Sequence, residues 1–237
     1  MRKGAATRER ILQIAEASVL AKGFEATSIE EIISEAGITK SGFFYHFRDK
    51  NELAKEMVRR YVAANDELFD DIFGRARELS DDPLQRLLIG LKLLAEVMSD
   101  LPNGHPGCLI ASVCYQERLF DRQVVELTAE SVRGWNARFR GYFEEVAATY
   151  PPRAAVDLDT LAEMLSCVVD GGIIMGKTLR DPHLLEQQIM AFRSFVSLVF
   201  SSQIPVVEAV LAAGAATGAA AQVTRDEGCR LTQSEER

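Results

Sequence analysis

The sequence predicts an all-α protein. Apolar residues recur three or four positions apart through almost all of its 237 residues, which is the repeat of a helix face. The glycines and prolines fall mainly between these stretches, and no stretch reads convincingly as a strand. Several stretches also begin with Ser, Thr or Asp followed three residues later by Glu, a pattern typical of helix starts.

Four helices are predicted in the first third of the chain. The first runs from about residue 7 to a stop at Gly23, and a second helix of about two turns ends at Gly37. Thr39 can cap a third short helix. Asp49 and Glu52 form a capping box that opens a long helix reaching about residue 72.

The remaining chain predicts five more helices. A helix follows Pro83 and ends before the loop "DLPNGHPG", and a short one covers "CLIASVCY". A long helix then spans about residues 122–149, and the last two contain residues 158–176 and 185–199. Beyond about residue 203 the Ala/Gly-rich and then charged sequence predicts a frayed helix and a disordered tail. We therefore expect a small domain over 1–50, a larger one over 51–202 and a tail over 203–237.

The charge is divided unevenly along the chain. The formal net charge is -8, but residues 1–60 hold eleven Lys or Arg against nine Asp or Glu. The first quarter is therefore slightly basic. The acidic remainder disfavours a nucleoid-type protein that coats DNA regardless of its sequence. Four cysteines without a CxxC pair, no long apolar run and no signal peptide predict a cytoplasmic protein with reduced thiols and no membrane partner.

Residues 171–178, "GGIIMGKT", match the phosphate-binding loop of nucleotide-binding proteins. Such a loop joins a buried strand to a helix, whereas the residues before it have helical periodicity. Only 59 residues follow Thr178, too few for a nucleotide-binding sheet. The alternative is that Gly172 and Gly176 let another helix approach closely. We therefore expect no enzyme and no cofactor, and a nucleotide-binding enzyme stays the lesser alternative.

The second and third predicted helices, with the short turn between them, have the layout of a helix-turn-helix. The third helix carries hydroxyl, amine and imidazole groups within two turns, which suits contact with DNA. The third helix together with its flanking residues reads "GITKSGFFYHFRDKNEL". This stretch resembles the signature of the TetR (tetracycline-repressor-like) family of transcriptional regulators, and residues 8–58 are similar to that family's DNA-binding unit.

The resemblance implies roles for ten residues. Phosphate contacts are implied for Thr27, Ser28, Tyr45, His46 and Lys50, and base contacts for Thr39, Lys40, Ser41 and Gly42. The chain departs from the family at Phe44, where the family usually has Tyr. The missing hydroxyl removes one phosphate hydrogen bond at this contact position, at a cost of about 1 kcal/mol.

The resemblance also implies that the larger domain binds a small effector and forms a homodimer. The soft and aromatic side chains expected around an effector are Met98, Cys108, Val113, Trp135, Phe139, Met164, Cys167 and Met175, with ordinary core packing as the alternative. No charged residue stands out among them, so we expect a mainly apolar effector. Cys108 and Cys114 could instead sense electrophiles or oxidants. With His105 they fit no standard zinc spacing, and no metal is expected.

Pairing of two chains through the last two helices is expected to form a four-helix bundle. The residues assigned to this interface are Gly172, Gly176, Leu185, Ile189, Phe192, Val196 and Val199. Phe195, Leu198 and Phe200 make the last helix apolar on a second face, which predicts burial on two sides. The dimer would read a palindromic operator with half-sites about 34 to 36 Å apart. The sequence thus predicts a repressor released from its DNA operator by an effector.

Overall fold

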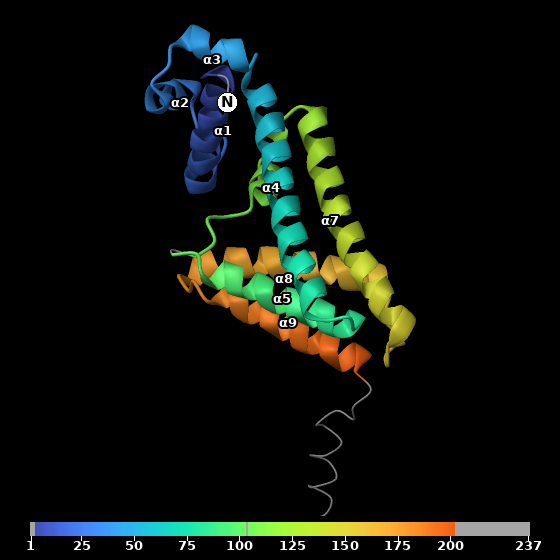
Figure 1. Ribbon diagram of the computed structural model, residues 1–237. Helices are drawn as coiled ribbons and strands as arrows, with labels where there is room; N and C mark the ends of the chain where they lie inside the picture. Colours follow the sequence, from blue (N-terminus) through green and yellow to red (C-terminus); the bar gives the residue numbers. More distant parts are fainter. Residues whose placement is uncertain (1–2, 103, 202–237) are drawn as a thin grey trace, which may run out of the picture. The chain divides into compact units, whose positions relative to one another are not determined.

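The structure is a computed structural model that describes residues 3–102 and 104–201, and the regular structure of these residues is helical throughout. The helices are α1 (Lys3–Lys22), α2 (Ile29–Ala36), α3 (Lys40–His46), α4 (Lys50–Leu79), α5 (Pro83–Ser99), α6 (Leu109–Tyr115), α7 (Arg122–Thr149), α8 (Leu158–Leu179) and α9 (Leu184–Phe200) (Figure 1). A 3-10 turn, Glu117–Leu119, separates α6 from α7. The all-α prediction is confirmed, with its order of helices. The predicted tail, 203–237, lies outside the described residues.

Polar side chains begin the helices where the sequence places them. The Ser28 hydroxyl accepts the Glu31 backbone N–H at 3.1 Å, and the Asp49 carboxylate accepts that of Glu52 at 2.8 Å. These bonds satisfy backbone donors that have no partner within the helix. Gly37 ends α2 with φ 61°, a left-handed conformation that favours glycine.

The first three helices form a small cluster against the start of α4. Figure 1 shows α1, α2 and α3 in blue beside the upper part of α4. Ile11, Ile32, Phe43 and Phe47 have no exposed surface and form the centre of this cluster. Each helix contributes one apolar face, and α3 is fixed by two phenylalanines.

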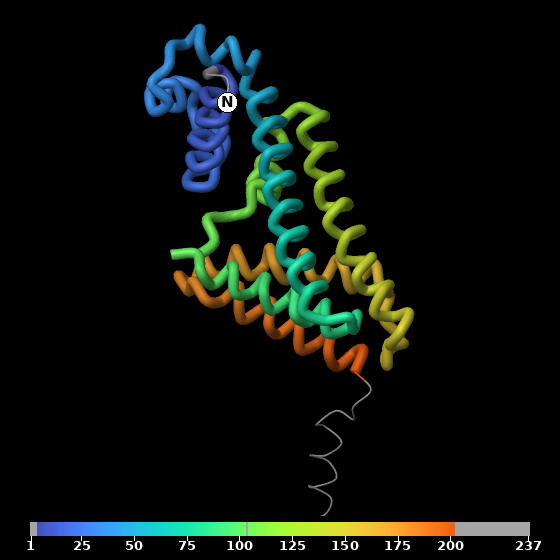
Figure 2. The backbone as a smooth tube through the Cα atoms, viewed as in Figure 1, coloured from blue at the N-terminus to red at the C-terminus, as the bar shows by residue number. Residues whose placement is uncertain are grey.

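In the larger part of the described chain, the two long helices α4 and α7 contact each other along their length. Below them, α9 packs against both α5 and α8 (Figures 1 and 2). Figure 2 shows that the chain after α5 returns toward α1. There α6 contacts α1, α4 and α7. The chain thus joins the larger core to the first three helices through both α4 and α6.

The residues predicted to form the dimer interface instead pack inside one chain. Leu185, Ile189, Phe192, Val196 and Val199 are at most 5% exposed in the single chain. A Cβ atom at Gly172 would lie 2.8 Å from Leu185 Cδ1, and one at Gly176 would lie 3.1 Å from the Asp181 carbonyl oxygen. The prediction of close helix approach is confirmed at Gly172, where the approaching helix is α9 of the same chain, whereas the close neighbour of Gly176 is the loop that follows α8. The interface assignment of Gly172 and the five α9 residues is therefore wrong, because these residues are already buried within the chain, whereas Gly176 is partly exposed.

The phosphate-loop motif lies within a continuous helix. Residues 171–178 are part of α8, which continues to Leu179, and no strand precedes them in the described chain. Their backbone N–H groups are used within the helix, so they form no phosphate-binding nest. In the described residues, no helix is both long enough and apolar enough to cross a membrane.

Candidate functional site

Helix α3 presents one face to solvent because its other face is anchored. Phe43 and Phe47 have no exposed surface, whereas Phe44 is 44% and Tyr45 is 82% exposed. Lys40 and Ser41 are exposed as well, one turn earlier. This surface, the α3 face, consists of Lys40, Ser41, Phe44 and Tyr45.

The start of α3 is held by hydroxyl groups. The Thr39 hydroxyl accepts the Gly42 backbone N–H at 3.1 Å, and its oxygen lies 3.1 Å from that of Ser41. A Cβ atom at Gly42 would lie 3.3 Å from the Thr39 oxygen, so a larger residue would press on this cap. Lys40 lies 3.5 Å from the Glu30 carboxylate in an ion pair that is exposed on both sides. Such a pair exchanges readily for a phosphate or a base.

Thr27 and Ser28, predicted to hold phosphates, differ in accessibility. Ser28 is exposed at the start of α2. Thr27 is 1% exposed, and its hydroxyl donates to the Gly23 carbonyl at 2.9 Å and lies 3.1 Å from that of Ser18. A phosphate contact by the Thr27 side chain is therefore contradicted. The sequence shows a hydroxyl residue near a helix start, but the fold turns this hydroxyl inward.

Lys50 and His46 are partly buried. The Lys50 ammonium donates to the Phe24 carbonyl at 2.6 Å and lies 4.4 Å from the centre of the Phe24 ring. This burial lowers the pKa of Lys50. The ring of His46 packs edge-on against Tyr45, with 5.0 Å between ring centres. Lys50 must leave the Phe24 carbonyl to reach a phosphate, whereas Tyr45 is already free to do so.

Arg48 was not among the predicted contact residues. Its side chain is 76% exposed just after α3 and forms a 3.0 Å ion pair with Asp49. Because it follows the α3 face directly, it adds an exposed positive charge beside that face. The signal was present in the quoted motif, where Arg48 lies between the aromatic residues and the cap of α4.

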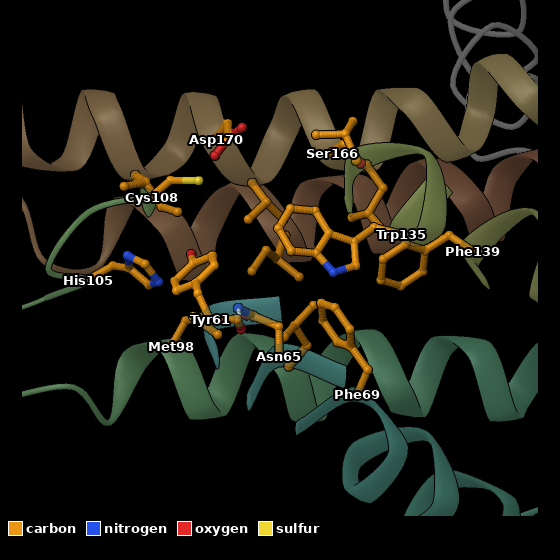
Figure 3. A pocket seen from close by; sticks show the side chains of 16 residues that line it. Tyr61, Asn65, Phe69, Met98, His105, Cys108, Trp135, Phe139, Ser166 and Asp170 are labelled. Atoms are coloured by element: carbon orange, nitrogen blue, oxygen red, sulfur yellow. Dashed lines mark hydrogen bonds between the residues drawn. The ribbon is translucent and has the colours of Figure 1, made fainter. Parts of the chain in front are cut away.

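A pocket lies between helices α4, α5, α7 and α8 and the segment before α6. Its cavity volume is about 80 Å³, and the pocket is partly open to solvent. Figure 3 shows Asp170, Cys108, His105 and Tyr61 toward one end of the pocket and Trp135, Phe139 and Phe69 toward the other. The lining residues are Tyr61, Asn65, Phe69, Leu94, Met98, His105, Cys108, Val132, Trp135, Phe139, Leu165, Ser166, Val169, Asp170, Ile173 and Ile189.

Half of the predicted effector residues line this pocket. Met98, Cys108, Trp135 and Phe139 do so. The remaining four do not: Val113 is buried beside a separate open groove, and Met164, Cys167 and Met175 are exposed on α8. Their assignment to the pocket is wrong because the helix repeat groups residues by face without telling which neighbour that face meets. Tyr61, Asn65 and Phe69, all on α4, were missed.

The polar end of the pocket carries a charge that the sequence analysis overlooked. The Asp170 carboxylate interacts with the Cys108 thiol, which also interacts with the Tyr61 hydroxyl. Burial, then the negative charge of Asp170, raises the pKa of Cys108 to about 12. Burial also raises the pKa of Tyr61, and burial with the Lys177 charge lowers the pKa of His105. The expectation of an uncharged lining is therefore wrong, although the acid in "CVVDGGII" was a visible signal.

The cysteines do not form a reactive or metal-binding cluster among the described residues. Cys108 is 7% exposed, and its raised pKa keeps it as a thiol at neutral pH, where only the thiolate reacts readily. Cys114 and Cys167 are exposed free thiols. In residues 3–102 and 104–201, no three His, Cys, Asp or Glu side chains are placed to hold a metal ion.

Two contacts connect the pocket region to the first three helices. The Lys177 ammonium donates to the Pro106 carbonyl at 2.7 Å and to the Leu20 carbonyl, near the end of α1, at 3.4 Å. At the end of α6, the Gln116 side-chain oxygen accepts the Phe24 backbone N–H at 2.9 Å. Cys108 begins α6 and lines the pocket. Lys177, the lysine of the phosphate-loop motif, thus links α8 to the end of α1 and to the segment before α6 through two backbone carbonyls.

Comparison with known proteins matches both the sequence and the fold. Residues 11–57 match the sequence model of a family described as bacterial regulatory proteins, tetR family. The chain is 25% identical over 211 residues to the uncharacterized HTH-type transcriptional regulator YxaF of Bacillus subtilis, covering 85% of this chain and 94% of that protein. It is 31% identical over 83 residues to the HTH-type transcriptional repressor KstR2 of Mycobacterium tuberculosis, covering 34% of this chain and 38% of that one.

Solved structures show the same arrangement of helices. The regulatory protein TetR from Rhodobacter sphaeroides superposes with a TM-score of 0.66 at 23% identity, covering 78% of this chain and 96% of that chain. A TetR-family regulator from Agrobacterium tumefaciens gives a TM-score of 0.70 at 18% identity, covering 84% of this chain and all of that one. At these identities, the likeness establishes the fold alone.

Proposed function

Because the chain is a helix-turn-helix transcriptional regulator of the TetR family, we propose that it binds a specific DNA operator as a homodimer and represses transcription there. A small molecule in the pocket between α4, α5, α7 and α8 would release it. The observation that carries the proposal is the α3 face, whose exposed Lys40, Ser41, Phe44 and Tyr45 stand on a helix anchored by Phe43 and Phe47. We place the activity in the cytoplasm, where bacterial DNA lies.

The α3 face has the chemistry to read a major groove. Lys40 and Ser41 offer donors to base edges, and the Tyr45 hydroxyl offers one to a phosphate. Ser28, at the start of α2, and Arg48, just after α3, are exposed as well and suit the flanking phosphates. Phe44 provides apolar contact in place of a tyrosine hydroxyl. Specific base contacts are required because the net charge of -8 disfavours binding by charge alone.

For the dimer, we propose the faces of α8 and α9 that point away from the core of the chain. Met164, Met175 and Leu179 on α8 and Phe195 and Leu198 on α9 are 38 to 59% exposed. Met164 and Met175 are eleven residues apart, or about three helical turns, so they lie on one side of α8. Two such faces would join as a four-helix bundle about a two-fold axis. The two α3 helices would then reach half-sites about 34 to 36 Å apart.

Helix α6 offers a route from the pocket to the DNA. Cys108 at its start lines the pocket, and Gln116 at its end holds the backbone at Phe24. A ligand that displaces the start of α6 would therefore pull on the segment that leads into α2. Because both chains of the dimer must fit one DNA face at once, a small rotation of each would weaken binding strongly.

Fluorescence anisotropy with the full chain tests the proposal. Duplexes that tile the region upstream of the protein's own gene are titrated against scrambled duplexes of the same composition, over a range of salt concentrations. We expect one duplex to bind at least about a hundredfold more tightly than its scrambled partner, with two chains per duplex. Equal, weak binding of every duplex would reject sequence-specific regulation from this region.

A cysteine-based sensor is the weaker alternative. Its best candidate, Cys108, is buried and has a raised pKa of about 12, so it lacks the positive surroundings that activate a thiol. The same observation favours a ligand that binds without a covalent bond. Treatment with an alkylating reagent is therefore expected to leave Cys108 unmodified in the folded protein.

A further inference from the structure

We propose that the pocket takes an organic cation, a protonated amine with an aromatic body that also carries a hydrogen-bond acceptor. The ammonium group would bind the Asp170 carboxylate, and the body would lie against Trp135 and Phe139. This inference rests on the proposed function, since it specifies the effector of the same pocket. It replaces the mainly apolar molecule that the sequence suggested.

The charge of the lining selects a cation. Of the sixteen lining residues, Asp170 alone carries a formal charge when His105 is neutral, and burial favours that neutral form of His105. Among the described residues, no Lys or Arg side chain lies within ion-pair distance of Asp170. The half-buried carboxylate therefore has two uncharged polar neighbours in the pocket, the Cys108 thiol and the Tyr61 hydroxyl. A positive ligand group would remove this imbalance, whereas a carboxylate would be repelled.

The aromatic end selects a flat body with an acceptor. Trp135 and Phe139 line it together with Phe69, whose ring meets that of Phe139 edge-on with 5.3 Å between centres. The indole N–H of Trp135 is buried without a hydrogen-bond partner. A buried donor without a partner is costly, so an ether, carbonyl or hydroxyl oxygen of the ligand is favoured there.

An approach path reaches the acidic end from outside. Asp170 and Val132 line both the pocket and a neighbouring open groove, whose other charged residues, Glu117 and Arg133, have opposite signs. A charged ligand could therefore meet the carboxylate before its body enters the apolar part. This order limits the cost of bringing a charge into the pocket.

The test uses matched trios of small molecules with the full-length protein. The three members of a trio share one aromatic body, which is methoxyphenyl in one trio and methylphenyl in the other. Within each trio, the body carries an ethylamine, an ethanol or an acetate group. Isothermal titration calorimetry measures affinity, and the fluorescence of Trp135, the single tryptophan, reports occupancy of this pocket. We expect each amine to bind at least about tenfold more tightly than its alcohol, with no binding of the acetates. The methoxy amine should bind more tightly than the methyl amine.

Two substitutions separate the charge from the fold. Asp170→Asn should remove the preference for amines, and Asp170→Glu should retain it. Asp159→Asn is the matched control, because it removes a carboxylate eleven residues earlier on α8, where Asp159 forms a surface ion pair with Arg140 at 2.9 Å. It should leave amine binding unchanged. Trp135→Phe, followed by calorimetry, should abolish the advantage of the methoxy over the methyl body.

The outcomes distinguish the ligand class from the regulatory function. Tighter binding of alcohols or acetates, unchanged amine binding in Asp170→Asn, or no binding of any amine would overturn the ligand class. The operator assay is then repeated with each molecule. If amines bind the pocket without weakening DNA binding, the ligand class stands and effector release fails. If only an anion or a neutral molecule releases the DNA, release stands and the cationic ligand is rejected.

Discussion

The Gln116 side-chain oxygen accepts the Phe24 backbone N–H across 2.9 Å, although the two residues lie 92 positions apart. Phe24 also packs against Phe120, with 4.4 Å between ring centres. Both contacts join the segment between α1 and α2 to the segment between α6 and α7. The position of α2, and of α3 after it, therefore depends on where α6 lies.

Gln116→Ala should weaken this connection. The Phe24 N–H would lose its partner, so the free energy of unfolding should fall by about 1 kcal/mol, measured by urea denaturation. Ligand release of DNA should also require more ligand, because α6 pulls less on α2. Gln13→Ala is the control, since Gln13 bonds only to Glu9 on the same helix. Equal effects of the two substitutions would argue against a specific role for Gln116.

Tyr45→Phe should weaken operator binding about tenfold, because the exposed hydroxyl would no longer donate to a phosphate. Affinity is measured by fluorescence anisotropy. The matched control is Tyr115→Phe, which removes a hydroxyl from a tyrosine that is 75% exposed on α6, compared with 82% for Tyr45. The proposed contact fails if Tyr45→Phe binds the operator as tightly as the control does.

Leu198→Asp should break the proposed dimer, because the α8 and α9 faces that we propose as its interface would then carry an aspartate from each chain in place of an exposed leucine. We expect the dimer dissociation constant to rise at least about tenfold, measured by analytical ultracentrifugation. Leu79→Asp provides a close control, because Leu79 at the end of α4 is 59% exposed and Leu198 is 57% exposed. A dimer that survives Leu198→Asp unchanged would place the interface elsewhere.

Gly172→Ala should destabilise the fold. The added Cβ would lie 2.8 Å from Leu185 Cδ1 and 3.2 Å from Leu185 Cα, so α9 would have to shift. We expect a loss of about 1 to 2 kcal/mol in the free energy of unfolding. At Gly134, in the middle of α7, an added Cβ meets nothing within 4 Å. Gly134→Ala should therefore raise the free energy of unfolding by up to about 1 kcal/mol. If both substitutions changed the free energy of unfolding in the same direction, the close packing of Gly172 against Leu185 would be contradicted.

Asp157→Asn should change how stability depends on pH. Hydrogen bonds from the backbone N–H and the hydroxyl of Thr160 lower the pKa of Asp157 below its ordinary value of 3.8. A lowered carboxyl pKa stabilises the fold above pH 3.8, and this contribution is lost as the pH falls through the lower, folded-state value. When the pH is lowered from about 6 to about 3, the free energy of unfolding should therefore fall less in the variant than in the wild type. Asp71→Asn, which removes an exposed carboxylate that caps no helix, should follow the wild type.

The sequence by itself determined the helices, their order and most of their starts. The repeat of apolar residues, the hydroxyl and carboxylate caps at Ser28, Thr39 and Asp49, and the stop at Gly37 are local features, and local features act within a few residues. The α3 motif was recognisable for the same reason, since its contact residues and anchors lie within one short segment. Met98, Cys108, Trp135 and Phe139 could be assigned to a pocket from residue type.

Only the tertiary structure decided which faces meet. The heptad positions of α9 were correctly identified as a buried stripe, but the fold places that stripe against α5 and α8 of its own chain and exposes Phe195 and Leu198. In the same way, Thr27 turns inward and Asp170 turns into the pocket. Helical periodicity fixes a side chain's angle about its own axis. The partner on that side depends on how distant helices cross, which local sequence does not encode.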